Sequence, residues 1–327
     1  MIRFLKAYIK SMRLYYSFVT GFAGWIGVAY YEFLVNCPTE HTIEITPTPE
    51  KKLIILFMLF MSWGINQIIN DYLGLKEDRI NAPDRPMVTG ELHPGWALAL
   101  SIFLLGVCAG ITWFFLNPFA IIFLITGVLL NVIYEFAKGY VFLGNIVFGV
   151  MIVQATLYGG YASGPTENSF LIRWRLAGLI LVGVINGLMT FYTYFKDYHG
   201  DKIAGKNTIV VKYKLEASKI LSIVFAFLPT IVFFIMRITG MIAFPLNRTF
   251  ILLGILTVVL QIWTGILFFL NPIGEKTYTS LKTDFRACVC GEAAIIAFFN
   301  PELAIWLFLA AYILVGFLFD LHKNPKS

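Results

Sequence analysis

The chain has 327 residues, of which 58% are hydrophobic and only 13% are charged, and its mean hydropathy is +0.77. No water-soluble domain needs that much apolar surface, so the composition excludes the ordinary globular classes and indicates a polytopic helical membrane protein whose first partner is the lipid bilayer. The formal net charge of +6 requires no nucleic acid, because lysines and arginines concentrated in loops on one side of a membrane give the same excess.

Apolar runs of spanning length recur along the chain, and eight of them are clear. A last region, 284–321, is broken at Asn300-Pro301 and could form one long bent span or two short ones. Nine transmembrane helices are therefore expected, with ten possible. Only helices satisfy their own backbone hydrogen bonds at such lengths in lipid, so we predict an all-α bundle that forms a single domain over residues 1–327. The eight clear runs lie at about 14–35, 51–73, 95–115, 117–137, 141–163, 172–195, 215–239 and 249–271.

Charged loop residues predict the orientation of this multi-pass bundle. The 36–50 loop carries Glu40, Glu44 and Glu50 and lies on the opposite side from the loops that are basic or of mixed charge. The positive-inside rule then puts the basic loops in the cytoplasm. The loops on that side include three that carry the motifs described below, at 70–94, 134–140 and 196–214.

The first cluster of polar residues follows the second apolar run. Asp71 and Asp78 are seven residues apart, which on a continuous helix is an angle of about 20°, and Asn70 and Asp78 would be about 80° apart. Glu77 can share the same side. Hard oxygen ligands this close repel one another unless a cation lies among them, which predicts a divalent-metal site. The alternative is an ordinary solvated loop between two spans.

A smaller pair follows the fourth run. Tyr134 and Lys138 are four residues apart and can point together. An interfacial tyrosine and a topology-setting lysine would give the same pattern.

The second acidic cluster follows the sixth run. Asp197 and Asp201 are one helical turn apart, so both carboxylates can reach one point. The two acidic clusters are four spans apart, and an even number of crossings returns the chain to the same side. Four acids and several cations at the mouth of an apolar cavity suit a pyrophosphate head, bridged by Mg²⁺, with a hydrocarbon tail. The lysines around the second cluster are Lys196, Lys202 and Lys206.

These pieces, in this order, resemble the UbiA superfamily of intramembrane prenyltransferases over nearly the whole chain. The family's first motif, NDxxDxxxD and a later Arg-Pro, resembles Asn70 to Asp78 and Arg85-Pro86. Its YxxxK loop is similar to Tyr134 to Lys138. Its second motif, DxxxD followed by Gly-Lys-x-Thr, resembles Asp197 to Asp201 followed by Gly205 to Thr208.

The chain departs from the first motif at one position, because Gly74 stands where the family has its middle acid. A glycine has no side-chain ligand. Asp71 or Glu77 could compensate; otherwise metal binding is weaker, or the chemistry has diverged within the fold.

The resemblance implies Mg²⁺-dependent transfer of an isoprenoid from a polyprenyl diphosphate to an acceptor, with release of pyrophosphate and, as expected for this family, two Mg²⁺ ions. It implies that Tyr134 lines the reacting centre. It implies that the metal is held by Asn70, Asp71, Asp78, Asp197 and Asp201. It implies that the diphosphate is held by Arg85, Lys138 and Lys202, with Lys196, Lys206 and Arg13 as further candidates.

The sequence leaves the reaction partner open. The acceptor could be an aromatic quinone precursor, another hydrophobic acceptor or a glycerol-phosphate ether lipid. A second hypothesis is a membrane terpene cyclase, in which the carbocation is captured by its own chain, and the Gly74 departure keeps it open. A third, a transporter or lipid-binding protein, predicts charges along a pathway, whereas the charges here cluster at one mouth.

Overall fold

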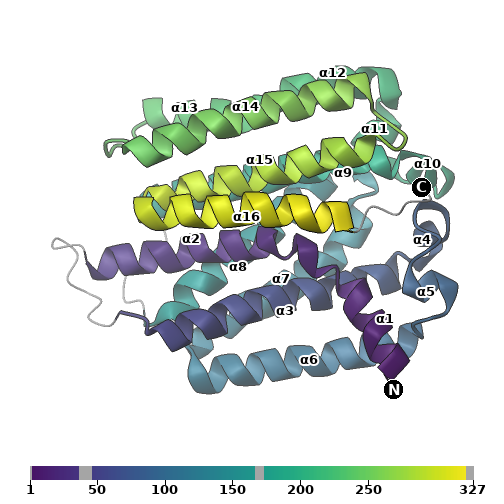
Figure 1. Cartoon of the computed structure of the whole chain (residues 1–327), viewed down its shortest axis with the longest axis horizontal. Helices are drawn as coiled ribbons and strands as arrows, with labels where there is room; N and C mark the ends of the chain where they lie inside the picture. The colour runs from purple at the N-terminus through teal and green to yellow at the C-terminus, as the bar shows by residue number, and fades with distance from the viewer. Residues whose placement is uncertain (1, 37–45, 166–172, 322–327) are drawn as a thin grey trace.

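The computed structural model describes residues 2–36, 46–165 and 173–321, so Glu40 and Glu44 of the acidic loop lie outside the described residues. The described chain is a bundle of helices (Figure 1), as its composition predicts. Two strands of two residues each are the exception, and they pair with one another. In chain order the elements are α1 (Ile2–Met12), η1 (Leu14–Tyr16), α2 (Phe18–Val35), α3 (Pro49–Leu73), α4 (Leu75–Asn81), α5 (Pro86–Thr89), α6 (Pro94–Phe115), η2 (Pro118–Ala120), α7 (Ile121–Ala137), β1 (Tyr140–Val141), α8 (Leu143–Ser163), α9 (Arg173–Lys196), α10 (Tyr198–Ile203), β2 (Asn207–Thr208), α11 (Ile209–Lys212), α12 (Lys214–Ala226), α13 (Leu228–Ile238), α14 (Arg248–Leu270), α15 (Thr277–Ala297) and α16 (Pro301–Leu321).

Eight helical segments among the described residues are long and apolar enough to cross a membrane, and they correspond to the eight predicted runs. They are Phe18–Val35, Pro49–Leu73, Pro94–Phe115, Pro118–Ala137, Leu143–Ser163, Arg175–Lys196, Lys214–Ile238 and Arg248–Leu270.

The last region forms two helices, α15 and α16, which are separated at the predicted break of Asn300-Pro301. Pro301 begins α16, where its missing N–H costs nothing, and the Asn300 side chain accepts a hydrogen bond from the Leu303 N–H at 3.1 Å. Most of α15 is buried, including Asp284 and Glu292. It carries too many polar residues to count among the eight apolar segments, and its burial places it inside the bundle.

The long helices lie side by side in layers (Figure 1). α12, α13 and α14 form one side of the bundle and α6 the opposite side, with α15, α16, α9, α2, α8, α7 and α3 between them. The short helices α4, α5, α10 and α11 gather at one end, on the right of the view. We call this the motif end, because the predicted motif residues lie there.

α2 and α8 pack closely because glycines face each other across their contact. A Cβ built on Gly159 would lie 1.9 Å from the carbonyl oxygen of Gly24, and one built on Gly27 would lie 2.0 Å from the carbonyl oxygen of Thr156. Small residues let helix backbones approach in this way, and van der Waals contact then replaces the hydrophobic effect that lipid does not provide. This close contact holds α8, the helix that follows Lys138, in the centre of the bundle.

Candidate functional site

A cavity opens at the motif end, with an empty volume of about 1090 Å³ that includes solvent at its mouth. Its walls come from the break after α1, from α3, α4, α7, α9, α10 and from α15, which contributes Leu281 and Phe285. Ten of the twelve predicted site residues line it, namely Arg13, Asn70, Asp71, Asp78, Arg85, Tyr134, Lys138, Lys196, Asp197 and Asp201. The structure therefore brings the three predicted motifs to one place.

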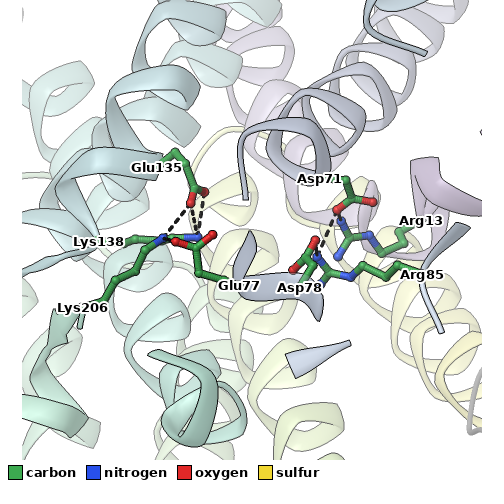
Figure 2. Close-up of polar contacts among 8 residues, drawn as sticks. All are labelled: Arg13, Asp71, Glu77, Asp78, Arg85, Glu135, Lys138 and Lys206. Atoms are coloured by element: carbon green, nitrogen blue, oxygen red, sulfur yellow. Dashed lines mark hydrogen bonds and ion pairs between the residues drawn. The ribbon is translucent and has the colours of Figure 1, made fainter. Parts of the chain in front are cut away.

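The first motif does not form the single continuous helix on which the predicted angles between Asn70, Asp71 and Asp78 depend. α3 ends at Leu73 and α4 begins at Leu75, with Gly74 between them. The Gly74 N–H still donates to the Asn70 carbonyl at 2.7 Å, and the Gly74 carbonyl accepts from the Asp78 N–H at 2.9 Å. The chain therefore bends without unwinding, and the side chains after the bend point differently from a straight helix. Glu77 and Asp78, adjacent in sequence, join two separate groups of ion pairs (Figure 2).

The first group, which we call the arginine cluster, contains Arg13, Asp71, Asp78 and Arg85 (Figure 2). The Asp71 carboxylate is 1% exposed and pairs with Arg13 and with Arg85, the latter at 3.1 Å. Arg85 also pairs with Asp78. Burial raises the pKa of Asp78 despite the opposing effect of Arg85. Burial alone would lower the pKa of Arg85, but the Asp71 and Asp78 carboxylates outweigh it and raise that pKa.

Arg13 reaches this cluster from an unusual backbone conformation. It lies between α1 and η1 with φ 46° and ψ 49°, in the left-handed region. That region costs a residue with a Cβ about 1–2 kcal/mol, and such outliers gather at functional sites. The ion pair with the buried Asp71 holds it there.

The second group, which we call the lysine cluster, contains Glu77, Glu135, Lys138 and Lys206 (Figure 2). The Glu135 carboxylate accepts from Lys138 at 2.6 Å and from Lys206 at 2.8 Å. Lys206 also pairs with Glu77 at 3.1 Å. Burial tends to lower the pKa of Lys206, but Glu135 and Glu77 outweigh it and raise that pKa.

Glu135 was missed as a site residue by reasoning from the sequence. Its side chain is only 8% exposed, and it lines the cavity beside Tyr134. One signal was available: a carboxylate in the last turn of a membrane-spanning run is costly unless it has a partner. The partners are Lys138, four residues after Tyr134, and Lys206 of the second motif.

The second acidic motif lies where α9 meets α10. Asp197 separates the two helices, and its carbonyl accepts from the Asp201 N–H at 3.0 Å, so the two carboxylates are one turn apart as predicted. Asp201 is 4% exposed. Burial, and then the negative charge of Asp197, raise the pKa of Asp201 to about 7, because the opposing effects of Lys138 and Lys206 are smaller.

Backbone contacts join two of the three motif segments. The Tyr134–Lys138 segment forms the end of α7 and not a loop. β1, which follows it, pairs in parallel with β2 of the second motif, with Tyr140 opposite Asn207. The Asn207 N–H also donates to the Gly139 carbonyl at 3.2 Å. These contacts explain how Lys206, just before β2, reaches Glu135 on α7.

Two predicted diphosphate ligands are not at the cavity wall. Lys202 is exposed, does not line the cavity, and has its amine 5.9 Å from the centre of the Tyr198 ring. Neighbouring residues of a helix point about 100° apart, so Asp201 faces inward and Lys202 outward. Lys206 does not line the cavity either, but it is joined to it through the lysine cluster.

A smaller cavity lies next to the first, toward the middle of the bundle. It shares Trp63 and Gln67 with the larger one and has an empty volume of about 560 Å³. We call it the inner chamber. Its lining is mostly apolar, with a few polar side chains such as Asn66 and Asn131, and the Asn131 amide donates to the Asn66 carbonyl at 3.1 Å. The apolar lining residues are Met58, Leu59, Trp63, Phe123, Leu124, Met151, Ile152 and Ala155.

The donor set suits a hard divalent cation once the cations of the site have moved. Among the described residues, no group of three or more His, Cys, Asp or Glu side chains is placed to hold a metal ion by itself, because arginines and lysines stand between the carboxylates. The Asn70 side-chain oxygen lines the same cavity, is buried, and has no hydrogen-bond partner among the residues that the structure describes. Carboxylate and amide oxygens are the ligands that Mg²⁺ takes from proteins, together with substrate phosphates.

Comparison with known proteins agrees with this arrangement. Residues 44–283 match the model of the UbiA prenyltransferase family. Digeranylgeranylglyceryl phosphate synthase of Thermococcus sibiricus is 28% identical over 229 residues, which cover 68% of this chain and 74% of the relative. The protein of the same name from Sulfolobus acidocaldarius is 30% identical over 216 residues, which cover 64% of this chain and 70% of the relative.

Solved structures share the fold. A UbiA homologue from Aeropyrum pernix in its apo form has a TM-score of 0.66 at 17% identity, covering 86% of this chain and 97% of the homologue. A UbiA homologue from Archaeoglobus fulgidus bound to DMAPP and Mg²⁺ has a TM-score of 0.59 at 13% identity, covering 96% of this chain and 99% of the homologue. The family model spans well over half of the chain, and its motif order, cavity and fold agree with it, so this protein is a member of the UbiA prenyltransferase family.

Proposed function

We propose that this protein transfers a prenyl group from a prenyl diphosphate to a hydroxyl group of a glyceryl phosphate lipid, with release of diphosphate. The observation that carries the proposal is a cavity of paired cations and carboxylates that adjoins a mostly apolar inner chamber. Such a site suits a ligand with a polyanionic head and a hydrocarbon tail. Membership of the family supports prenyl transfer.

The choice of acceptor rests on the relatives. The proteins from T. sibiricus and S. acidocaldarius are named for a product with two geranylgeranyl groups on glyceryl phosphate. Of the acceptors that the sequence leaves open, this name matches the glycerol-phosphate lipid and contains no aromatic acceptor.

The diphosphate would bind by exchange of partners. Arg13, Arg85 and Lys138 line the cavity and are paired with carboxylates, and phosphate oxygens can replace those carboxylates in charge-assisted hydrogen bonds. The carboxylates released in this way, with the Asn70 oxygen, would hold Mg²⁺. When bound, Mg²⁺ would neutralise charge that develops on the departing diphosphate. The residues proposed to hold it include Asn70, Asp71, Asp78, Asp197 and Asp201.

The aromatic and apolar wall of the cavity would stabilise the reacting carbon and keep water away from it. The allylic C–O bond breaks and the diphosphate leaves with the electron pair; an acceptor oxygen then forms the new C–O bond, and its proton passes to the departing diphosphate. The rings of Tyr134 and Phe148 line the cavity with their centres 5.3 Å apart. Aromatic faces stabilise cations, and an apolar wall excludes the water that would otherwise capture the carbocation.

The test is release of diphosphate by the purified protein with Mg²⁺ and prenyl diphosphates of two to four isoprene units. We expect turnover only when a glyceryl phosphate that carries one prenyl ether is added. Turnover with an aromatic acceptor instead would support prenyl transfer but contradict the proposed glyceryl phosphate acceptor. A cyclised product formed without acceptor would replace the proposal with a terpene cyclase.

We also infer that the motif end faces the cytoplasm, because the basic loops gather there. Lys202 is exposed at that end, so a Lys202→Cys variant should react with a membrane-impermeant maleimide in inverted vesicles. Reaction in right-side-out vesicles would reverse the orientation. Cys108, Cys288 and Cys290 are buried. The fourth cysteine, Cys37, is removed as Cys37→Ser in both the variant and its control, so that labelling reports on position 202.

A further inference from the structure

The carboxylate of Glu135 occupies the space beside Gly74. A Cβ built on Gly74 would lie 3.4 Å from Glu135 Oε1 and 3.7 Å from Glu135 Cδ. Both residues line the main cavity. A longer side chain at position 74 would therefore enter space that the Glu135 carboxylate of α7 already occupies.

Two features of Glu135 call for more than a structural role. First, its carboxylate is buried at the end of an apolar helix, where an ionised group is costly unless it is paired. Second, it is paired with two lysines at once, at 2.6 and 2.8 Å. One of them, Lys206, has Glu77 as an additional partner, so Glu135 is not required merely to neutralise it.

Position 74 is also where the resemblance places the missing acid of the first motif. Glu77, the first acid after position 74, pairs with Lys206. The motif acids on either side of position 74, Asp71 and Asp78, belong to the arginine cluster. Neither reaches the side of the cavity where Gly74 meets Glu135, according to their ion pairs. The carboxylate closest to the position of the missing side chain comes from a different helix.

We propose that Glu135 supplies from α7 the carboxylate that position 74 lacks, and that it is a ligand of the Mg²⁺ that binds with the diphosphate. This inference rests on the proposed function and adds a residue to it. When the diphosphate enters, Lys138 exchanges Glu135 for phosphate oxygens, Lys206 keeps Glu77 as its partner, and the freed Glu135 carboxylate turns to the metal. Glycine at position 74 leaves room for this carboxylate, and an acid there would compete for the same space.

A swap of the acid between the two positions tests the proposal. Three variants are needed: Glu135→Gln, Gly74→Asp, and the double variant that carries both changes. The readout is binding of Mn²⁺, a paramagnetic substitute for Mg²⁺, by the full-length protein with inorganic pyrophosphate, followed by electron paramagnetic resonance. This readout depends on neither acceptor nor turnover.

We expect Glu135→Gln to weaken Mn²⁺ binding by about tenfold or more, in line with the loss of a group that contacts or supports a bound metal. The double variant should recover much of that affinity, because Gly74→Asp places a carboxylate close to the position of the lost Glu135 carboxylate. Gly74→Asp alone should not bind more tightly than wild type. Glu135→Gln with wild-type affinity, or a double variant no better than Glu135→Gln, would overturn the inference.

Matched variants separate a ligand from a residue that only positions the lysines. Glu77→Gln removes the other carboxylate bound to Lys206; if Glu135 acted only through that lysine, both variants would lose affinity equally and the double variant would not recover. Glu135→Asp keeps the charge and should bind Mn²⁺ more tightly than Glu135→Gln, and it serves if the latter does not fold. Glu216→Gln, at an exposed ion pair with Lys219, should bind Mn²⁺ as wild type does.

The two proposals fail in different ways. Wild-type protein that binds no Mn²⁺ with pyrophosphate would overturn both. Wild-type binding that is unaffected by Glu135→Gln would overturn only the role of Glu135.

Discussion

The Asn81 side-chain oxygen accepts a hydrogen bond from the backbone N–H of Gly200 at 2.9 Å. Asn81 is the last residue of α4, and Gly200 lies in α10. A Cβ on Gly200 would lie 1.9 Å from that oxygen, so the contact needs a glycine. Because α4 carries Asp78 and α10 carries Asp201, this one bond fixes the first acidic motif relative to the second.

Removal of this bond should loosen the site before it unfolds the protein. Asn81→Ala leaves a buried N–H without its acceptor, at a cost of about 1–3 kcal/mol. We expect the Mg²⁺ concentration for half-maximal activity to rise several-fold, with a smaller change in the unfolding temperature. Asn81→Asp keeps an acceptor oxygen and should stay close to wild type. An unchanged Mg²⁺ requirement in Asn81→Ala would show that the bond does not position the acids.

Two of the predicted diphosphate lysines, Lys138 and Lys202, should differ sharply on substitution. Lys138 lines the cavity and pairs with Glu135, whereas Lys202 is exposed outside it. Lys138→Ala removes a charge-assisted contact to phosphate, so kcat/KM for the prenyl diphosphate should fall by at least tenfold, about 1.4 kcal/mol. Lys202→Ala should stay within twofold of wild type. Equal losses of kcat/KM in the two variants, measured by steady-state kinetics, would mean that Lys202 also binds the diphosphate.

The raised pKa of Asp201 should make stability depend on pH in a direction that can be checked. In the folded protein this pKa is about 7, against an ordinary value of 3.8, so between these values the folded state holds a proton that the unfolded chain has released. Stability from this group therefore falls as pH rises through about 4 to 7 and is constant above.

The comparison that isolates Asp201 uses Asp201→Asn. The unfolding temperature of the wild type in detergent should fall between about pH 4 and pH 7, and that of the variant should fall less, since the amide cannot ionise. Other titrating groups, Asp78 among them, are common to both proteins. Parallel pH curves would mean that Asp201 does not titrate in this range.

The glycine contact between α2 and α8 should not tolerate a methyl group. Gly27→Ala would put a carbon 2.0 Å from the backbone oxygen of Thr156, which can move only if α8 moves with it. We expect the free energy of unfolding to fall by about 1–3 kcal/mol. Gly106→Ala on α6 has open space and should be neutral or slightly stabilising by thermal unfolding, because alanine favours helix. A stable Gly27→Ala would show that α2 and α8 can separate without cost.

The sequence predicted the scaffold of this protein because apolar runs report directly on spanning helices. The eight runs are found as helices, and ten of the twelve predicted site residues line one cavity. The break at Gly74 was not predicted, since helical angles were counted as if the helix were continuous. Such counts carry no information on which helix faces which, so they could not place Glu135 against Gly74 or Asn81 against Gly200. Lys202 was misplaced because a position next to a motif acid does not fix the direction of a side chain.

In Figure 2, four cations face four carboxylates. These charges cancel, so each ligand alone would upset the balance. An anion would have to leave carboxylates unpaired, and a cation would have to displace lysines and arginines from their carboxylates. A diphosphate and a divalent cation that arrive together satisfy both sets at once. The affinity for each should therefore rise in the presence of the other, by the same factor, which makes the ion-pair network a device that recognises a combination of ligands.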